Sequence, residues 1–323
     1  MFAHEVLAGL DKYIKINRQR GDDARSRGLT RLISSIKESV HFYLGDLDDI
    51  SYGVLDKRQR IGMEPKEFLP YMRPPYKQVF FMWTVNSPEG EKDDDASKRA
   101  SLVLDISPSD KFRALSFQDF YLSSVSGSWE VLPFVMNLAI GYAWGDLYSE
   151  LRLLSDDSFG RRFAGGNWFP MPSEHLLEKI GKEGSFTAET GAAWVETVFG
   201  SSIIQEQAGD WKTCIDAMIF LNCRNGGSIV IAPPARMNRS RKKHGKQPLL
   251  SYRVLTIKAQ EKMHHGEPHA PGDHVRVHLQ RGHYKHYTAA APLMGQHVGL
   301  WWWQPHVRGR NREGIVLKDY AVG

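Results

Sequence analysis

The chain has only two cysteines in 323 residues and no apolar run long enough to span a bilayer. Cys214 and Cys223 are too few for a disulfide framework and too widely spaced for a CxxC site, and they fit a reducing compartment. The most apolar segment, residues 131–145, is too short for a membrane span. The N-terminus lacks the basic region and apolar core of a secretory signal. We therefore predict a cytoplasmic protein that is not associated with a membrane.

The motifs of common cofactor sites are also missing. Neither a Walker loop nor GxGxxG nor GxSxG occurs in the chain. The histidines follow no recognised zinc-ligand spacing, and the only carboxylates near the histidine-rich segment are Glu261, Glu267 and Asp273. The sequence therefore predicts no cofactor and no metal.

What is present is an ordinary globular composition with an uneven distribution of charge. Hydrophobic residues make up 41%, and the length suggests roughly two domains. The net charge of +5 combines two unlike parts. Residues 1–235 carry 26 Lys and Arg against 32 Asp and Glu, whereas residues 236–323 carry 16 against 5. An acidic body followed by a basic part favours a polyanion partner, or docking between the two parts.

Hydrophobic periodicity predicts an α+β fold with a mixed helical and β body over residues 1–235. Apolar residues at helical spacing predict helices over residues 2–19 and 29–44, and one or two more over 187–224. Segment 131–145 reads as a buried strand or helix. Aromatic-rich apolar runs predict strands over 78–85, 100–107 and 112–124.

A basic linker and a small antiparallel β domain are expected after this body. The linker covers residues 236–247 and the domain covers residues 248–323. Strands are expected over 248–260, 274–288 and 297–309, and the last two form a hairpin.

The linker concentrates cations without any acid. Its six basic residues within 11 positions are Arg236, Arg239, Arg241, Lys242, Lys243 and Lys246. Such a run can neutralise phosphates and bind nucleic acid in a salt-dependent way. The alternative is a solvated linker between the two parts.

The C-terminal hairpin is rich in histidine and aromatic residues. Ten of the 13 histidines lie between His244 and His306, and histidine readily exchanges protons near neutral pH. Arg281 is a candidate phosphate contact. Antiparallel pairing is expected to bring His283, His286 and Tyr287 near Trp302, His306 and Arg308.

Three interpretations of this hairpin remain open. In the first, basic residues hold phosphates while Trp302 or a tyrosine stacks on bases. In the second, RNA is cleaved without metal: one histidine takes the 2′-OH proton, a second histidine or a tyrosine protonates the leaving oxygen, and arginine stabilises the phosphorane. The residues expected to be catalytic are then His283, His286, Tyr287, His306 and Arg308. In the third, the aromatic residues fill a small core and the arginines pair with the acidic body.

Two strings resemble phage and prophage proteins of unassigned function: NRSRKKHGKQPLLSYRVLTI at 238–257 and RGHYKHYTAAAPLMGQHVGLWWWQPHVRG at 281–309. The pattern spans about 70 residues, and the resemblance implies a phage origin and the host cytoplasm. The hairpin is also similar in residue type to compact ribonuclease toxins. The leading hypothesis is a phage-associated protein that binds RNA or DNA through its basic C-terminal domain. The alternatives are a metal-independent ribonuclease and a protein that binds a host partner, such as an inhibitor of a host defence system.

Overall fold

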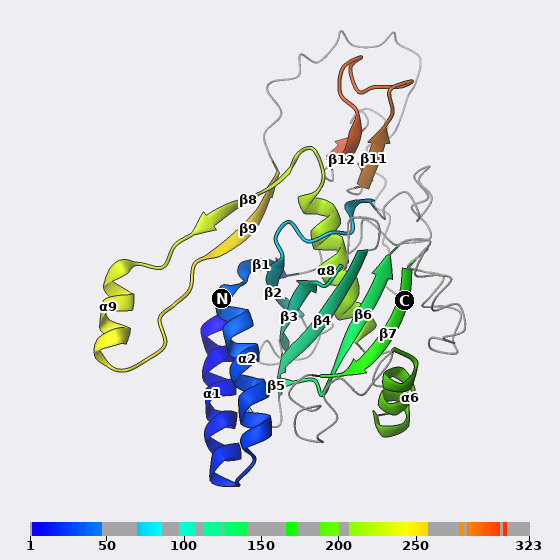
Figure 1. Cartoon of the computed structure of the whole chain (residues 1–323). Helices are drawn as coiled ribbons and strands as arrows, with labels where there is room; N and C mark the ends of the chain where they lie inside the picture. The colour runs from blue at the N-terminus through cyan, green and yellow to red at the C-terminus, as the bar shows by residue number, and fades with distance from the viewer. Residues whose placement is uncertain are drawn as a thin grey trace.

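A computed structural model gives the fold of the chain and confirms the α+β class (Figure 1). It describes residues 2–46, 70–85, 97–107, 113–123, 126–140, 166–173, 188–199, 207–257, 278–280, 283–303 and 306–308. Within this part of the chain, no helix is long and apolar enough to cross a membrane.

A mixed sheet forms the centre of the molecule. From one edge to the other its order is β7 (Gly166–Pro172), β6 (Phe134–Ile140), β4 (Arg113–Leu122), β3 (Ser97–Asp105), β2 (Gln78–Val85), β1 (Val40–Asp46), β9 (Tyr252–Ile257) and β8 (Gly226–Ile231). The short strand β5 (Trp129–Val131) pairs with the end of β4. Strand β1 is parallel to both β2 and β9, and the other neighbouring pairs are antiparallel.

Helices cover both faces of this sheet, which explains why β2 is apolar along most of its length. Phe80 and Met82 of β2 pack in one cluster with the antiparallel helices α1 (Ala3–Gln19) and α2 (Asp23–Glu38). Phe81 and Trp83 pack in the cluster on the opposite face of the sheet. The helices of that face are α6 (Ala188–Phe199) and α8 (Ala208–Leu221).

The second helix differs from its prediction over residues 29–44. It begins earlier, because the side chain of Asp22 accepts a hydrogen bond from the backbone N–H of Arg25 and caps the helix. It ends at Glu38, since Ser39 is extended and the β-branched and aromatic residues that follow form β1. The apolar residues Val40 and Leu44 fitted helical spacing, yet they lie in a strand.

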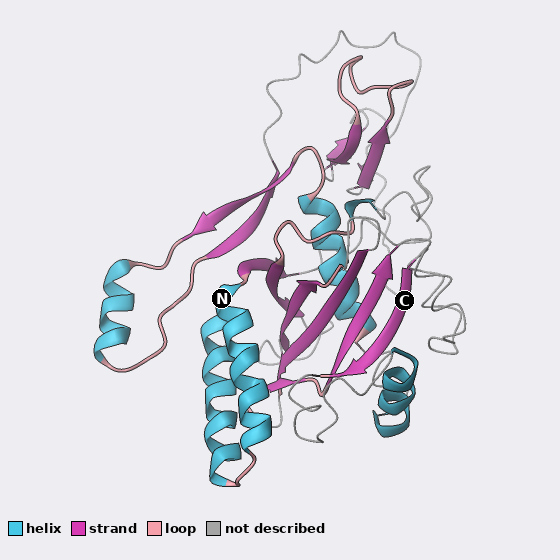
Figure 2. Cartoon of the chain, viewed as in Figure 1, coloured by secondary structure: helices cyan, strands magenta, loops and turns pink. Residues whose placement is uncertain are grey.

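The C-terminal hairpin forms two short ladders. Strand β10 (His278–Gln280) pairs with β13 (His306–Arg308), and β11 (His283–Tyr287) pairs with β12 (Gly299–Trp303). Both ladders keep one register, so they continue a single antiparallel hairpin, as predicted. Neither ladder is part of the large sheet (Figure 2). However, Tyr284, Leu300 and Trp302 belong to the hydrophobic cluster that includes α8.

The predicted linker has a different structure. Helix α9 (Ala235–Lys243) lies between β8 and β9, which pair with each other from Gly226↔Ile257 to Ile231↔Tyr252. We call Gly226–Ile257 the arm, because it projects from the sheet with α9 at its far end (Figure 1). Strand β9 was expected in the C-terminal domain, but it pairs with β1 in the large sheet.

Candidate functional site

Helix α9 has clear start and stop signals. Pro233 and Pro234 precede it, and proline is favoured at a helix start because its missing N–H has no partner to lose there. At the other end, Gly245 has a φ of 62°, its N–H donates to Lys242 O at 3.1 Å, and the N–H of Lys246 donates to Arg241 O at 2.9 Å. These two bonds form a Schellman motif, which glycine allows at low cost.

Contacts along its inner side hold this nine-residue helix, which would be marginal in isolation. The side-chain amide of Asn238 donates to Leu249 O at 2.9 Å and accepts from Leu249 N at 2.7 Å. Arg241 Nε donates to Gln247 O at 2.6 Å. The Gln247 side chain in turn donates to the Asp11 carboxylate of α1 at 3.0 Å. The segment that follows α9 therefore contacts α1.

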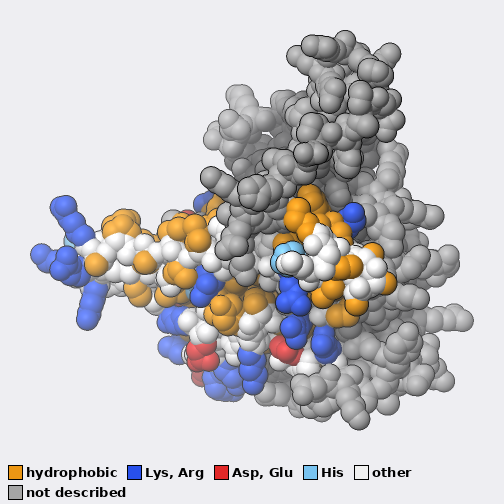
Figure 3. Space-filling model, turned by 90° about the horizontal axis from the view of Figure 1, so that it is seen from above, with side chains coloured by type: hydrophobic (Ala, Val, Ile, Leu, Met, Phe, Trp, Pro, Cys, Tyr) orange, Lys and Arg blue, Asp and Glu red, His pale blue; other side chains and the backbone are white. Residues whose placement is uncertain are grey.

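The outer side of α9 is a cationic surface. Arg236, Arg239 and Lys243 follow i, i+3, i+7 spacing, which places them on one face, and all three are exposed. None of the nine side chains of α9, all of which the structure describes, is buried, and none is acidic. Lys242 is also exposed, on the flank of this face. Figure 3 shows the Lys and Arg side chains gathered at the tip of the arm.

A cationic pocket of about 390 Å³ lies between α1 and the turn that follows α9. Lys12 and Lys15 of α1 line it, together with Arg241 and Lys246 of the arm. Asp11 also lines it, but its carboxylate already accepts a hydrogen bond from Gln247. The pocket therefore holds an excess of positive charge that an anion can neutralise.

The helices α1 and α2 add to this charge. Residues 2–39 contain eight Lys and Arg against five Asp and Glu. The acidic balance of residues 1–235 therefore does not extend to the helices beside the arm. Arg239, Arg241, Lys242, Lys243 and Lys246, predicted from the sequence to contact phosphates, lie at the arm tip near a helix hairpin of the same sign.

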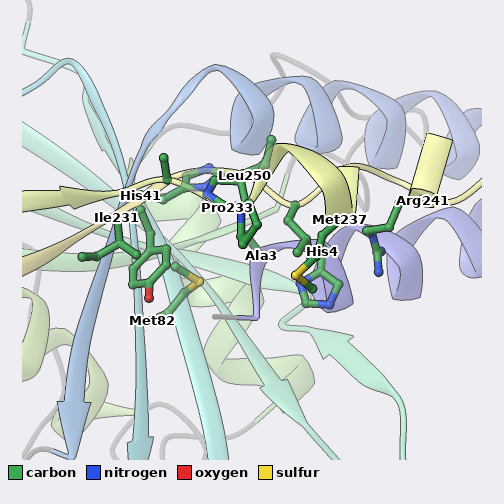
Figure 4. Close-up of a pocket in the computed structure, with 13 residues that line it drawn as sticks. Ala3, His4, His41, Met82, Ile231, Pro233, Met237, Arg241 and Leu250 are labelled. Atoms are coloured by element: carbon green, nitrogen blue, oxygen red, sulfur yellow. The ribbon is translucent and has the colours of Figure 1, made fainter. Parts of the chain in front are cut away.

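A second pocket, of about 330 Å³, lies next to the cationic one, where strands β8 and β9 lead to and from α9. We call it the apolar pocket, because most of its lining is hydrophobic, including Met82 of the sheet and Met237 of α9 (Figure 4). Arg241 lines both pockets. On α1, Ala3 and His4 line the apolar pocket, and the cationic pocket continues along the same helix from Ala8 to Lys15.

His41 is the buried polar side chain in the wall of the apolar pocket. It is 4% exposed, and its Nε2 lies 2.6 Å from Ile36 O. A carbonyl can only accept, so Nε2 carries the proton and donates. Burial lowers the pKa of His41, which keeps the imidazole neutral at neutral pH. In this tautomer, Nδ1 is a hydrogen-bond acceptor.

In the hairpin, the register does not bring the predicted catalytic residues into direct opposition. His283 pairs with Trp303, His286 with Leu300 and Tyr287 with Gly299, whereas His306 pairs with Gln280 and Arg308 with His278. His286 is exposed, but the neighbouring Tyr287 is buried. Arg281 lies outside the described residues. The backbone register therefore pairs none of these five residues with another of the five.

Trp302, predicted to stack on bases, is buried in the core. Its ring centroid lies 4.6 Å from that of Tyr284 and 6.4 Å from that of Phe220 on α8. The side chain of Asn225 bonds the Trp302 backbone twice, accepting from its N–H at 2.9 Å and donating to its carbonyl at 2.7 Å. Trp302 therefore anchors the hairpin to the end of α8.

Buried carboxylates near α8 were not anticipated. Asp119 of β4 accepts a hydrogen bond from Trp211 Nε1, and Arg99 pairs with Asp210 at 3.2 Å. Burial raises the pKa of Asp119 to about 7 and that of Asp210 to about 6. Asp216 is also buried and pairs with Lys212 at 2.8 Å. These contacts join α8 to the sheet and stabilise the helix from within.

Lys12 and Lys15 are the site residues that sequence reasoning missed. Their signal was present as the polar side of the helix predicted over residues 2–19, but nothing local indicated that the arm contacts that side.

Among the residues that the structure describes, no three His, Cys, Asp or Glu side chains form a metal-binding group. Comparison of the chain with protein-family models, curated proteins and solved structures gives no match, so the site is interpreted from its own geometry.

Proposed function

We propose that the protein binds nucleic acid through the outer face of α9 and the cationic pocket beside it. The observation that supports this most directly is the exposed trio Arg236, Arg239 and Lys243 on a projecting helix without an acidic residue. Like charges at i, i+4 destabilise a helix by roughly 0.2–0.5 kcal/mol. An external polyanion offsets this repulsion.

The shape of the arm supports the same function. A two-stranded ribbon carries α9 away from the sheet, so its cations reach a partner without displacing the core (Figure 1). Lys12 and Lys15 extend the positive surface along α1. Regularly spaced phosphates of RNA or DNA match a surface of this kind, and such contacts depend on salt because they release counterions.

The test is the salt dependence of binding. Fluorescence anisotropy would follow a labelled 20-base-pair duplex and a labelled single strand between 50 and 300 mM salt. We expect Arg239→Gln/Lys243→Gln to lower the slope of log K against log salt by about two, because each lost phosphate contact removes roughly 0.9. We expect affinity to fall roughly tenfold or more at low salt.

The matched control neutralises two exposed cations outside the arm and outside α1 and α2, in Arg73→Gln/Lys77→Gln. This control should keep the wild-type slope of log K against log salt. Absence of binding by the wild-type chain at 50 mM salt would overturn the proposal, and so would an equal loss of slope in both double variants.

A further inference from the structure

We propose that the apolar pocket receives one unstacked base of a single strand whose phosphates lie on the cationic pocket. This inference rests on the proposed function and specifies its ligand. A nucleotide joins a base with apolar faces to an anionic phosphate through its sugar. The two pockets place an apolar surface beside a cationic one in the same way, since Arg241 lines both.

The arrangement along α1 gives the order of these contacts. His4 stands at the apolar end and Lys15 at the cationic end of the same helix, 11 residues apart. At 1.5 Å per residue this separation is about 16 Å. A strand lying along α1 therefore places a base at one end, and phosphates farther along the same strand beside Lys12 and Lys15.

The wall of the apolar pocket suits a base. Tyr252 and the neutral imidazole of His41 line it together with aliphatic side chains. His41 uses Nε2 on Ile36 O and retains Nδ1 as an acceptor. The exocyclic amino groups of adenine, cytosine and guanine are donors that such an acceptor can bind.

Solvent reaches the pocket from the arm side. Ala232 and Met237 line it and are exposed, and Met237 keeps 50% of its surface accessible. The volume of about 330 Å³ lies at the small end of ligand pockets, which run roughly from 300 to 1,000 Å³. Bases in an intact duplex are stacked and paired, so a single strand is the form that can fill the site.

The experiment uses the full chain and three fluorescent probes: a 12-nucleotide strand, the same strand with three central abasic sites, and the duplex of the intact strand. Stacking on side chains is worth roughly 1–3 kcal/mol per base, so we expect the wild type to bind the intact strand at least about fivefold more tightly than the abasic one. A 2-aminopurine at the centre should change its emission on binding.

Ala232→Phe places a ring in the wall of the pocket, and Ala235→Phe adds the same ring at an exposed position of α9 outside the pocket lining. We expect Ala232→Phe to abolish the preference for the intact strand while keeping duplex binding and its salt slope. Ala235→Phe should retain the preference.

The outcomes separate the two proposals. If the wild type binds intact and abasic strands equally but binds the duplex with a steep salt dependence, the base pocket is wrong and the proposed function stands. If the wild type binds none of the three probes, both are wrong. Tight binding to phosphatidylglycerol vesicles, with no preference between intact and abasic strands, would also overturn the base pocket and would assign it to a lipid.

Discussion

The arm and the region around α8 place charge in opposite ways. On α9, Arg236, Arg239 and Lys243 are exposed. Around α8, carboxylates are buried and held by partners, as in the Arg99–Asp210 pair at 3.2 Å. Loss of one member of a buried pair is costly, whereas exposed charges contribute little to folding. The comparison shows that the charge near α8 serves the fold and that the charge on the arm is available to a partner.

The largest effect expected on the α8 side comes from Trp302→Ala. The indole packs on Tyr284 and Phe220, so its removal leaves a cavity where the hairpin meets α8. We expect the free energy of unfolding to fall by about 3–5 kcal/mol, measured by urea denaturation. Trp302→Phe should lose less unfolding free energy than Trp302→Ala, because the phenyl ring fills part of the cavity. A loss below about 1 kcal/mol for Trp302→Ala would show that the hairpin is not part of the core.

The buried carboxylates predict that the free energy of unfolding depends on pH, which the exposed cations of the arm do not predict. The pKa of Asp119 is raised from 3.8 to about 7, so the native state holds this proton more tightly than the unfolded state does. The contribution of Asp119 to stability therefore falls as pH rises from about 4 through 7. Asp210, Arg99 and Ser101 also face this group.

Urea denaturation at pH 5 and at pH 8 would measure this effect. We expect the wild type to lose more unfolding free energy over this range than Asp119→Asn does, because asparagine cannot ionise. Asp23→Asn, at an exposed position of α2, should behave like the wild type. If the wild type and Asp119→Asn lost equal unfolding free energy between pH 5 and pH 8, the raised pKa of Asp119 would be contradicted.

The sequence predicted helices and strands well where the apolar residues followed only one spacing, either helical or extended. The aromatic run at 78–85 gives β2 at its observed bounds, and the helix predicted over 2–19 is α1, Ala3–Gln19. The boundary near Ser39 failed because Val40 and Leu44 fit both helical and strand spacing. Local periodicity cannot distinguish the two, and pairing of β1 with β2 and β9 decides the outcome.

The candidate site was only half visible in the sequence. The basic run at 236–247 stood out as composition, but the sequence did not show the contacts that hold its helix. Asn238 binds Leu249 on the returning segment of the arm, and Gln247 binds Asp11 of α1. Lys12 meets Arg241 in one pocket although more than 200 residues separate them. Asp119 gave no signal either, since a carboxylate within an apolar strand does not reveal the partners that bury it.

The smallest effect is expected on the folding stability of Arg239→Gln/Lys243→Gln. It tests most sharply whether the charge of the arm, unlike the charge around α8, is dispensable for the fold. These two cations stand at i, i+4 on the exposed face of α9, and their repulsion costs roughly 0.2–0.5 kcal/mol. Urea denaturation should therefore give an unfolding free energy equal to that of the wild type, or higher by up to about 0.5 kcal/mol. Hydrogen exchange of the α9 amides should be unchanged or slower. A variant that loses nucleic-acid binding while folding at least as well as the wild type separates the two roles of charge. A loss above about 1 kcal/mol would mean that these cations support the arm itself, and the assignment of their charge to an external partner would then fail.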